Sequence, residues 1–288
     1  MMRWDQRPSV LVGLIGSGIQ ASRTPAMHER EGAEQGLRLV YRRIDLEVLG
    51  LAASALPDLL SAAEWMGFAG LNITFPCKQA VIPLLHELSE EALALGAVNS
   101  VVLRDGRRVG HNTDCAGFAE AFRRGLPGAP REHVLVLGAG GAGAAVAHAL
   151  LTEEVERLSI TDAEASRAEA LTESLVARFG VGRARAVPHA ASVMAAVDGL
   201  VNCTPVGMAK HPGMPLPAAL LRPDIWVADV VYFPFETELL RSARALGCRS
   251  LDGGGMAVFQ AVGAFRLFTG KAPDAERMLR HFREMTGV

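Results

Sequence analysis

Residues 133–150 read HVLVLGAGGAGAAVAHAL and carry the strongest structural signal in the chain. The apolar run His133–Leu137 predicts a buried strand, and the alanine-rich run that follows predicts a helix. Between them lies the pattern Gly138-x-Gly140-x-x-Gly143. The first glycine permits a tight turn, the second lets the backbone approach a pyrophosphate, and the third lets helix and strand pack closely. The stretch therefore predicts a dinucleotide-binding βαβ unit, with phosphates at the helix N-terminus.

A second strand, Arg157–Thr161, follows and ends at Asp162. This acid lies 19 residues after Gly143 (162 − 143), where dinucleotide-binding proteins carry the acid that binds ribose hydroxyls. It favours the dinucleotide interpretation over the alternative, a βαβ unit without a nucleotide. The cofactor-binding residues predicted in this part are Gly138, Ala139, Gly140, Gly141, Ala142, Gly143 and Asp162.

The composition is ordinary for a globular enzyme of 288 residues, a length that allows two domains. A net charge of −2 provides no basic surface for nucleic acid or an anionic membrane, and no apolar run is long enough to span a membrane. The cysteines are widely spaced, without Cys-x-x-Cys or a Cys/His cluster. They predict reduced thiols in the cytoplasm and no metal site. The four are Cys77, Cys115, Cys203 and Cys248.

Strands and helices alternate along the chain, which predicts an α/β fold with parallel sheets and ligands at the carboxyl ends of the strands. The first domain is predicted over residues 1–114, with an Asp105-Gly106 hairpin turn. Thr24 is predicted either to cap a helix that begins at Pro25 or to contact a ligand. Other strands are expected at 10–15, 39–44, 68–75, 96–103, 184–187, 199–203, 226–230 and 249–251. Other helices are expected at 49–67 (broken by Pro57 near its start), 114–124, 164–179, 190–197, 238–246, 256–268 and 273–285.

Lys78 and Asp114 are the best candidates for chemistry. Each follows a turn and precedes a helix. The chain has only three lysines, among many arginines. Unlike an arginine, a lysine can release a proton at a working pH. A Lys–carboxylate pair in a cleft can move a proton at a carbinol oxygen while a nicotinamide takes the hydride. The alternative for these two residues is a surface salt bridge.

Eight motifs together resemble the shikimate dehydrogenase family, occur in that family's order and cover nearly the whole chain. They are Ser22-x-Thr24-Pro25, Asn72-x-Thr74-x-Pro76-x-Lys78, Gly96-Ala-Val-Asn99, Asn112-Thr-Asp114, Gly138-Ala-Gly-Gly-Ala-Gly143, Asn202-x-Thr204, Val231-Tyr232-x-Pro234 and Gln260-Ala261.

The resemblance implies a substrate-binding domain over residues 1–114, completed by 256–288, and a Rossmann domain over 115–255 that binds the cofactor. It implies a cleft between them that closes on the ligands, with Lys78 and Asp114 as the catalytic pair. It also implies further binding residues. Those for substrate are Ser22 and Thr24 at the carboxylate, Asn72, Thr74, Asn99 and Gln260 at the ring hydroxyls, and Tyr232 near the carboxylate. Those for the cofactor are Asn202, Thr204, Val230, Gly253 and Met256.

Two departures from the biosynthetic members point to one branch of the family. Those members usually have Ser-x-Ser and a basic loop for the NADP phosphate, whereas this chain has Ser22-x-Thr24 and the loop Thr161-Asp-Ala-Glu164. An acid at the ribose repels a 2′-phosphate, although Arg167 lies nearby as a counter-charge. The chain therefore looks like the NAD-dependent quinate/shikimate dehydrogenase branch. Val206 is a third departure, where the family usually has Ser, and the sequence assigns it no effect.

The resulting hypothesis is reversible oxidation, with NAD, of the C3 hydroxyl of quinate and shikimate to the 3-dehydro acids. The alternative enzyme is an NADP-dependent biosynthetic shikimate dehydrogenase. A methylenetetrahydrofolate dehydrogenase has a similar domain plan, but the Ser-x-Thr-Pro loop argues against it. From a different class, the chain could be a non-catalytic NAD-binding regulator, against which the intact Lys78 and Asp114 argue. The oligomeric state stays open, with a homodimer among the assemblies considered.

Overall fold

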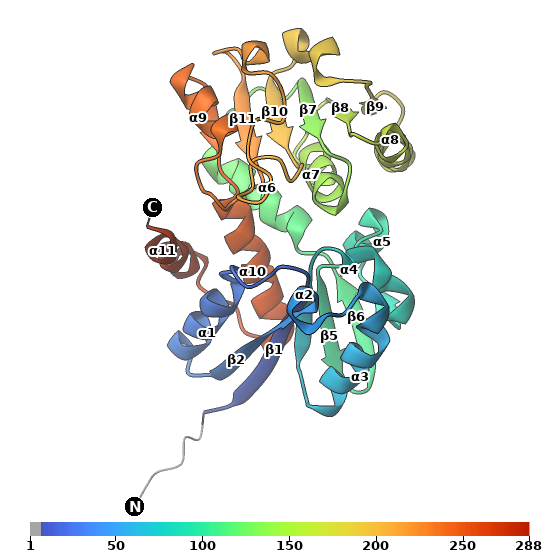
Figure 1. The fold of residues 1–288 in the computed structure, drawn as a ribbon, viewed down its shortest axis with the longest axis vertical. Helices are drawn as coiled ribbons and strands as arrows, with labels where there is room; N and C mark the ends of the chain where they lie inside the picture. Colours follow the sequence, from blue (N-terminus) through green and yellow to red (C-terminus); the bar gives the residue numbers. More distant parts are fainter. Residues whose placement is uncertain (1–6, 288) are drawn as a thin grey trace, which may run out of the picture. The chain divides into compact units, whose positions relative to one another are not determined.

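The computed structural model describes residues 7–287, which fold into two α/β units (Figure 1). The N-terminal unit ends at Thr113 and resumes at Val258, and the second unit spans Asp114–Ala257. The second boundary falls inside the long helix α10 (Gly254–Thr269).

The remaining elements of the N-terminal unit alternate between strands and short helices. The strands are β1 (Ser9–Gly16), β2 (Arg38–Asp45), β3 (Gly70–Ile73), β4 (Glu87–Leu88), β5 (Ser100–Arg104) and β6 (Arg107–His111). The helices are α1 (Thr24–Glu34), α2 (Leu46–Leu49), α3 (Leu56–Trp65), α4 (Cys77–Ala80), α5 (Glu90–Leu95) and α11 (Ala275–Thr286).

The sheet of the N-terminal unit is mixed, with strand order β2-β1-β3-β5-β6-β4. The first three strands run parallel, but β5 pairs antiparallel with both β3 and β6. Asp105 and Gly106 make the β5–β6 turn with φ of 52° and 70°, so the predicted hairpin is confirmed. The carboxyl ends of β1, β2 and β3 consequently meet at one edge of this sheet.

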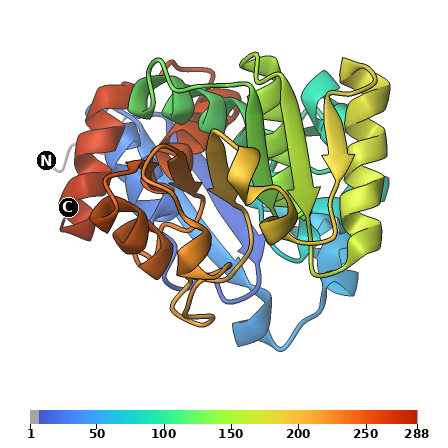
Figure 2. The ribbon, with the colours of Figure 1, turned by 90° about the horizontal axis from the view of Figure 1, so that it is seen from above.

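Apolar cores lie on both faces of this sheet. One face packs against α3 through residues such as Leu60 and Leu71, and the other packs against α10 through Phe265 and Phe268. The C-terminal helix α11 lies beside α1 (Figures 1 and 2). The last helices of the chain therefore belong to the N-terminal unit, as the position of Val258 in that unit also indicates.

The second unit is a doubly wound parallel sheet. Its strands are β7 (His133–Leu137), β8 (Arg157–Thr161), β9 (Ala184–Ala186), β10 (Gly199–Asn202), β11 (Trp226–Asp229) and β12 (Arg249–Leu251). Its helices, besides the start of α10, are α6 (Asp114–Gly125), α7 (Gly141–Thr152), α8 (Ala165–Phe179) and α9 (Glu238–Ala245).

The strand order of this sheet is β12-β11-β10-β7-β8-β9, and every pairing is parallel. Helices α6, α7 and α8 cover one face, and α9 covers the other together with the segment before β11. The chain leaves β7 toward β8 and later returns to β10 on the opposite side of β7. Such a switch point places a ligand at the carboxyl end of β7, where the glycine turn follows.

Three sequence predictions about helices were wrong. Thr24 does not cap α1: it is the first helical residue, and no side chain caps this helix. The helix expected from residue 49 begins only at Leu56, beside the expected break at Pro57, because Gly50 takes a left-handed conformation (φ 65°). Residues 190–197 form two short 3₁₀ turns, since Val193 at φ −131° interrupts a regular helix.

A buried ion pair joins α1 to α11. Glu31 is fully buried, and its two carboxylate oxygens accept hydrogen bonds from Nη2 and Nε of Arg277 at 2.7 and 2.8 Å. Burial alone would raise the pKa of Glu31, but the bonds from Arg277, the Asp274 backbone and Gln35 lower it. Glu31 is therefore a buried carboxylate whose charge depends on its partners.

We expect Arg277→Met to destabilise the protein by about 3–5 kcal/mol, because Glu31 then stays buried without its cation. The double variant Glu31→Gln/Arg277→Met should recover a large part of this loss, because it removes both charges. Urea unfolding of the wild type, both single variants and the double variant measures the coupling. Additive losses would contradict the interpretation.

Candidate active site

The glycine turn after β7 has the geometry that a close phosphate approach needs. Gly138 has a φ of 94°, and a Cβ there would meet the Cys203 backbone at 3.0 Å. A Cβ on Gly143 would meet the Gly138 carbonyl oxygen at 2.0 Å, so α7 can lie this close to β7 only without a side chain. Gly140 precedes α7, faces open space, and no side chain caps the helix. The turn thus fits a pyrophosphate against its backbone.

Asp162 lies directly beside this turn. Its Oδ2 accepts a hydrogen bond from the backbone N–H of Ala139 at 2.7 Å, and its Oδ1 accepts one from the backbone N–H of Glu164 at 2.9 Å. Each oxygen retains a second acceptor site, which suits the two hydroxyls of a ribose. Arg167, the first cation after Asp162 in the sequence, forms an exposed ion pair with Glu164 at 2.8 Å.

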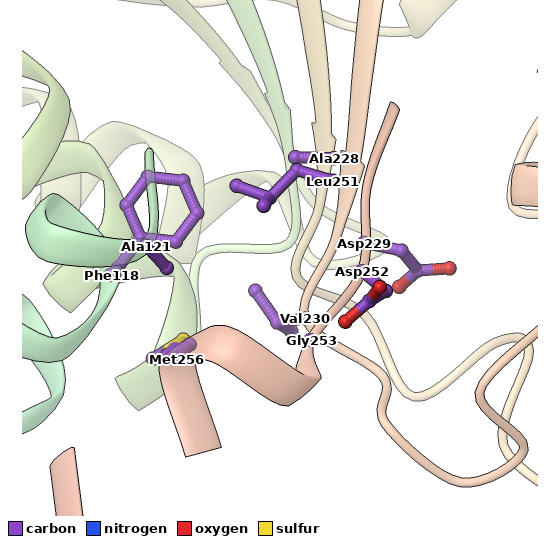
Figure 3. A pocket seen from close by; sticks show the side chains of 9 residues that line it. All are labelled: Phe118, Ala121, Ala228, Asp229, Val230, Leu251, Asp252, Gly253 and Met256. Carbon is purple, nitrogen blue, oxygen red and sulfur yellow. The ribbon is translucent and has the colours of Figure 1, made fainter. Parts of the chain in front are cut away.

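A small apolar pocket in the second unit collects three of the predicted cofactor residues, Val230, Gly253 and Met256 (Figure 3). Phe118 and Met256 line one side, whereas Asp229 lies on the other (Figure 3). A Cβ on Gly253 would lie 2.4 Å from the Val230 carbonyl oxygen, so this position requires glycine. Six of the nine residues that line this pocket have apolar side chains.

The carboxylate of Asp229 organises the loops around this pocket. It is buried and accepts hydrogen bonds from Asn202 Nδ2 (3.0 Å), Val231 N (3.0 Å) and Thr237 Oγ1 (2.7 Å). Thr237 also caps α9, since its hydroxyl accepts from Leu240 N. One carboxylate therefore holds the end of β10, the end of β11 and the start of α9. Burial raises the pKa of Asp229 to about 6 despite these bonds.

Asn202 and Thr204 form a compact turn after β10. The side-chain oxygen Oδ1 of Asn202 accepts from the Thr204 hydroxyl at 2.7 Å and from the Thr204 N–H at 3.1 Å. Val206 contributes only backbone groups, because its N–H donates to Thr204 Oγ1 and its carbonyl accepts from Asn202 Nδ2. The Val206 side chain takes no part in this turn, and nothing in the structure explains the departure at this position.

Tyr232 and Asp114 lie near each other within the second unit. Burial and the negative charge of Asp114 both raise the pKa of the Tyr232 phenol. Asp114 is itself 6% exposed and is the first residue of α6. The structure therefore associates one predicted catalytic residue with one predicted substrate residue.

In the N-terminal unit, Asn72 lies on β3 and is almost fully buried. Its Oδ1 accepts from the Tyr41 hydroxyl at 2.6 Å, and its Nδ2 donates to Ser100 Oγ at 2.9 Å and to the Asn99 carbonyl at 3.2 Å. Both amide protons are thus used inside the protein. Asn72 is placed to order the neighbouring groups of β2 and β5, and no motif marks its partner Tyr41.

Asn99 extends this polar network to Thr113, the residue at which the first segment of the N-terminal unit ends. Its amide group exchanges hydrogen bonds with Thr113: Oδ1 accepts from the Thr113 N–H at 2.9 Å, and Nδ2 donates to Thr113 Oγ1 at 2.9 Å. A Cβ on Gly263 of α10 would lie 3.0 Å from the Thr113 methyl group. Gln260 is three residues earlier, on the same helix face as Gly263. The network therefore places Asn72, Asn99 and Gln260 in one region.

The remaining predicted residues of this unit follow the carboxyl ends of β1 and β3. Ser22, in the segment between β1 and α1, and Thr24, the first residue of α1, are half-buried, and the Ser22 hydroxyl accepts from the Thr24 N–H at 3.3 Å. Thr74 follows β3, and its N–H donates to the Ile15 carbonyl. Lys78 lies in α4, half-buried, and its carbonyl accepts from Val98 N.

Residues 7–287 contain no group of three or more His, Cys, Asp or Glu residues that could hold a metal ion. None of their helices combines the length and apolarity needed to cross a membrane.

The strand order, the glycine turn and the acid after β8 define the second unit as the Rossmann domain of a nicotinamide-dependent oxidoreductase. Two family descriptions match the chain: the shikimate dehydrogenase substrate binding domain over residues 14–101, and the shikimate 5′-dehydrogenase C-terminal domain over residues 253–281.

Relatives of known name resemble the whole chain. A shikimate dehydrogenase (NADP(+)) from Streptomyces avermitilis is 59% identical, over 97% of each chain. A quinate/shikimate dehydrogenase (NAD(+)) from Corynebacterium glutamicum is 54% identical, over 95% of this chain and 98% of the relative. The structure of quinate dehydrogenase from Corynebacterium glutamicum in complex with NAD has a TM-score of 0.90 and 52% identity, and the match covers 96% of this chain and 99% of that one. The chain belongs to the shikimate dehydrogenase family.

The raised pKa of Asp229 makes stability depend on pH. The folded protein holds a proton here below about pH 6, whereas the ordinary value of 3.8 applies to the unfolded chain. This contribution to stability is full below pH 3.8 and is lost as the pH rises through 6. Between pH 7 and pH 5, wild type should therefore gain about 1 kcal/mol relative to Asp229→Asn.

Urea unfolding of wild type and Asp229→Asn at both pH values measures this difference. The subtraction cancels groups that titrate alike in both proteins. A stability difference that stays constant from pH 7 to pH 5 would mean that Asp229 is already charged at pH 5.

Proposed function

We propose that this chain is an NAD-dependent dehydrogenase that reversibly oxidises the C3 hydroxyl of quinate and shikimate to the 3-dehydro acids. The observation that carries the cofactor preference is Asp162, hydrogen-bonded to the turn at Ala139. A carboxylate there can accept from both ribose hydroxyls of NAD and repels the 2′-phosphate of NADP. The 54% identical relative named for quinate, shikimate and NAD supports the same choice.

In this proposal Lys78 and Asp114 are the catalytic pair. NAD supplies the hydride acceptor when it is bound. The Lys78 amine takes the proton from the C3 hydroxyl as the hydride leaves C3, and Asp114 keeps that amine oriented. The reverse reaction returns the proton from Lys78 to the carbonyl oxygen.

The other proposed contacts follow the chemistry of the substrate. Ser22, Thr24 and Tyr232 would bind the carboxylate, and Thr74, Asn99 and Gln260 would bind ring hydroxyls, with Asn72 holding Asn99 in place. The cofactor would lie on the turn Gly138–Gly143, with Asp162 at the ribose, Asn202 and Thr204 beside it, and Val230, Gly253 and Met256 at the nicotinamide. We place the enzyme in the cytoplasm, because its widely spaced cysteines suit a reducing compartment.

The second candidate is an NADP-dependent shikimate dehydrogenase, and the relative from Streptomyces avermitilis at 59% identity favours it. Overall identity is an average over the chain, whereas the 2′-position of the ribose is read by a few residues after β8. The acid at position 162 and the engaged Arg167 therefore weigh more in this choice.

Steady-state kinetics with both acids and both cofactors test the function. We expect turnover of quinate and shikimate, with kcat/KM for NAD at least about tenfold above that for NADP, because Asp162 repels the extra phosphate. Efficient NADP use with shikimate and no quinate turnover would establish the second candidate. No turnover of either acid with either cofactor would reject both candidates.

Lys78→Ala tests the proposed proton transfer. We expect kcat to fall at least about a hundredfold while KM changes less, because general acid–base catalysis is lost and binding largely remains. Lys210→Ala is the control, since it removes a lysine from an exposed loop. Near-normal turnover of Lys78→Ala would show that another group moves the proton.

A further inference from the structure

Arg43 lies near the carboxyl end of β2, and its guanidinium reaches the segment between β1 and α1. Its Nη2 donates a hydrogen bond to the Ser22 carbonyl at 3.1 Å. The side chain comes from the same sheet face as Tyr41, two residues earlier, whereas Arg42 faces the other way and is exposed. Arg43 itself is half-buried, so its charge is only partly hydrated.

No carboxylate within residues 7–287 pairs with Arg43. Its Nε is buried and has no hydrogen-bond partner among the described residues. The nearest acid on the strand, Asp45, is engaged elsewhere: its carboxylate accepts from Gly18 N, Ile19 N and Gln20 Nε2, and caps α2 through Glu47 N. Arg43 is thus a partly desolvated cation with an unused buried donor.

The guanidinium also lies close to the polar network of this unit. Burial raises the pKa of the Tyr41 phenol, and the positive charge of Arg43 opposes that rise. The Tyr41 hydroxyl in turn donates to Asn72 at 2.6 Å. Arg43 therefore lies between Ser22 on one side and the Tyr41–Asn72 pair on the other.

This arrangement suits an anion that arrives with the substrate. A half-buried cation without a counter-charge is costly, and a bound carboxylate would remove that cost. Ser22 and Thr24 can donate hydrogen bonds to a carboxylate from their hydroxyl and backbone N–H groups, but they carry no positive charge. Asp45 accepts hydrogen bonds from the segment before Ser22 and forms no ion pair with Arg43.

We propose that Arg43 is the counter-charge for the substrate's carboxylate and determines specificity for the free acid over uncharged analogues. This inference rests on the proposed function, in which Ser22 and Thr24 bind that carboxylate. Arg43 acts on binding and leaves the proton and hydride transfers unchanged. Its removal should therefore affect KM for the acids more than kcat.

The test compares shikimate with its methyl ester, which keeps the ring hydroxyls and lacks the charge. In Arg43→Gln, where the amide can still donate to the Ser22 carbonyl, we expect KM for shikimate to rise at least about tenfold, as for loss of a charge-assisted hydrogen bond. The ester should change less than about twofold, because it carries no charge for Arg43 to attract. The preference for acid over ester should consequently fall by about fivefold or more.

Arg42→Gln is the matched control, since it makes the same change of charge on the exposed face of the same strand. Arg43→Lys should retain most of the acid preference, because it keeps the charge. Arg43→Met is a second variant in case Arg43→Gln does not fold. Folding is checked by the melting temperature, and the second unit is checked separately by NADH binding.

Each outcome gives a decision. Equal losses for acid and ester in Arg43→Gln would mean that Arg43 only holds the loop, and an unchanged ratio would remove it from substrate recognition. Either result overturns the inference while leaving the proposed function intact. Wild type that turns over neither acid would reject the proposed function instead. Direct titration of shikimate into wild type and Arg43→Gln then decides the inference alone, and equal affinities would overturn it.

Discussion

The second unit depends on one steric constraint, the absence of side chains at Gly138 and Gly143. A Cβ at Gly143 would lie 2.0 Å from the Gly138 carbonyl oxygen, and one at Gly138 would meet Cys203. The turn after β7 is therefore pressed against the turn after β10. Because these strands are adjacent and parallel, that contact gathers the phosphate turn and the Asn202 turn at one edge of the sheet.

Two buried aspartates, one in each unit, hold loops at the ends of strands, and their pKa values shift in opposite directions. Asp229 joins β10, β11 and α9, and burial raises its pKa to about 6. Asp45 fixes the β1–α1 segment, and although burial would raise its pKa, donors from Gln20, Gly18, Ile19 and Glu47 lower it. Asp45 accepts three of its four hydrogen bonds from backbone N–H groups, which stabilise a carboxylate without a neighbouring cation. The two units thus use the same residue type for one task, the fixing of loops at strand ends.

The sequence predicts the local parts of this structure well, because those parts depend on residues close together in the chain. The glycine turn, the Asp105-Gly106 hairpin and the alternation of strands and helices follow from short patterns. The predicted helix at 190–197 was wrong, since its composition suits a helix that the backbone at Val193 does not form. Tyr41, Arg43, Asp45 and Asp229 carry no motif, and their roles depend on partners up to 31 residues away in the sequence. Short sequence patterns therefore provide candidates for chemistry, whereas the residues that order distant segments carry no such pattern.

The same distinction explains why relatives with different cofactors can be almost equally similar to this chain. Relatives named for NADP and for NAD are 59% and 54% identical to it. Substitutions in the sheets and apolar cores, far from the ribose, can account for a difference of this size. Cofactor choice depends instead on the charge beside the ribose, where Asp162 accepts from Ala139 and Glu164 engages Arg167. A single acid-to-base change there alters the local charge by two, yet hardly changes overall identity. Local electrostatics must therefore decide this question, since the fold and the glycine turn are compatible with either cofactor.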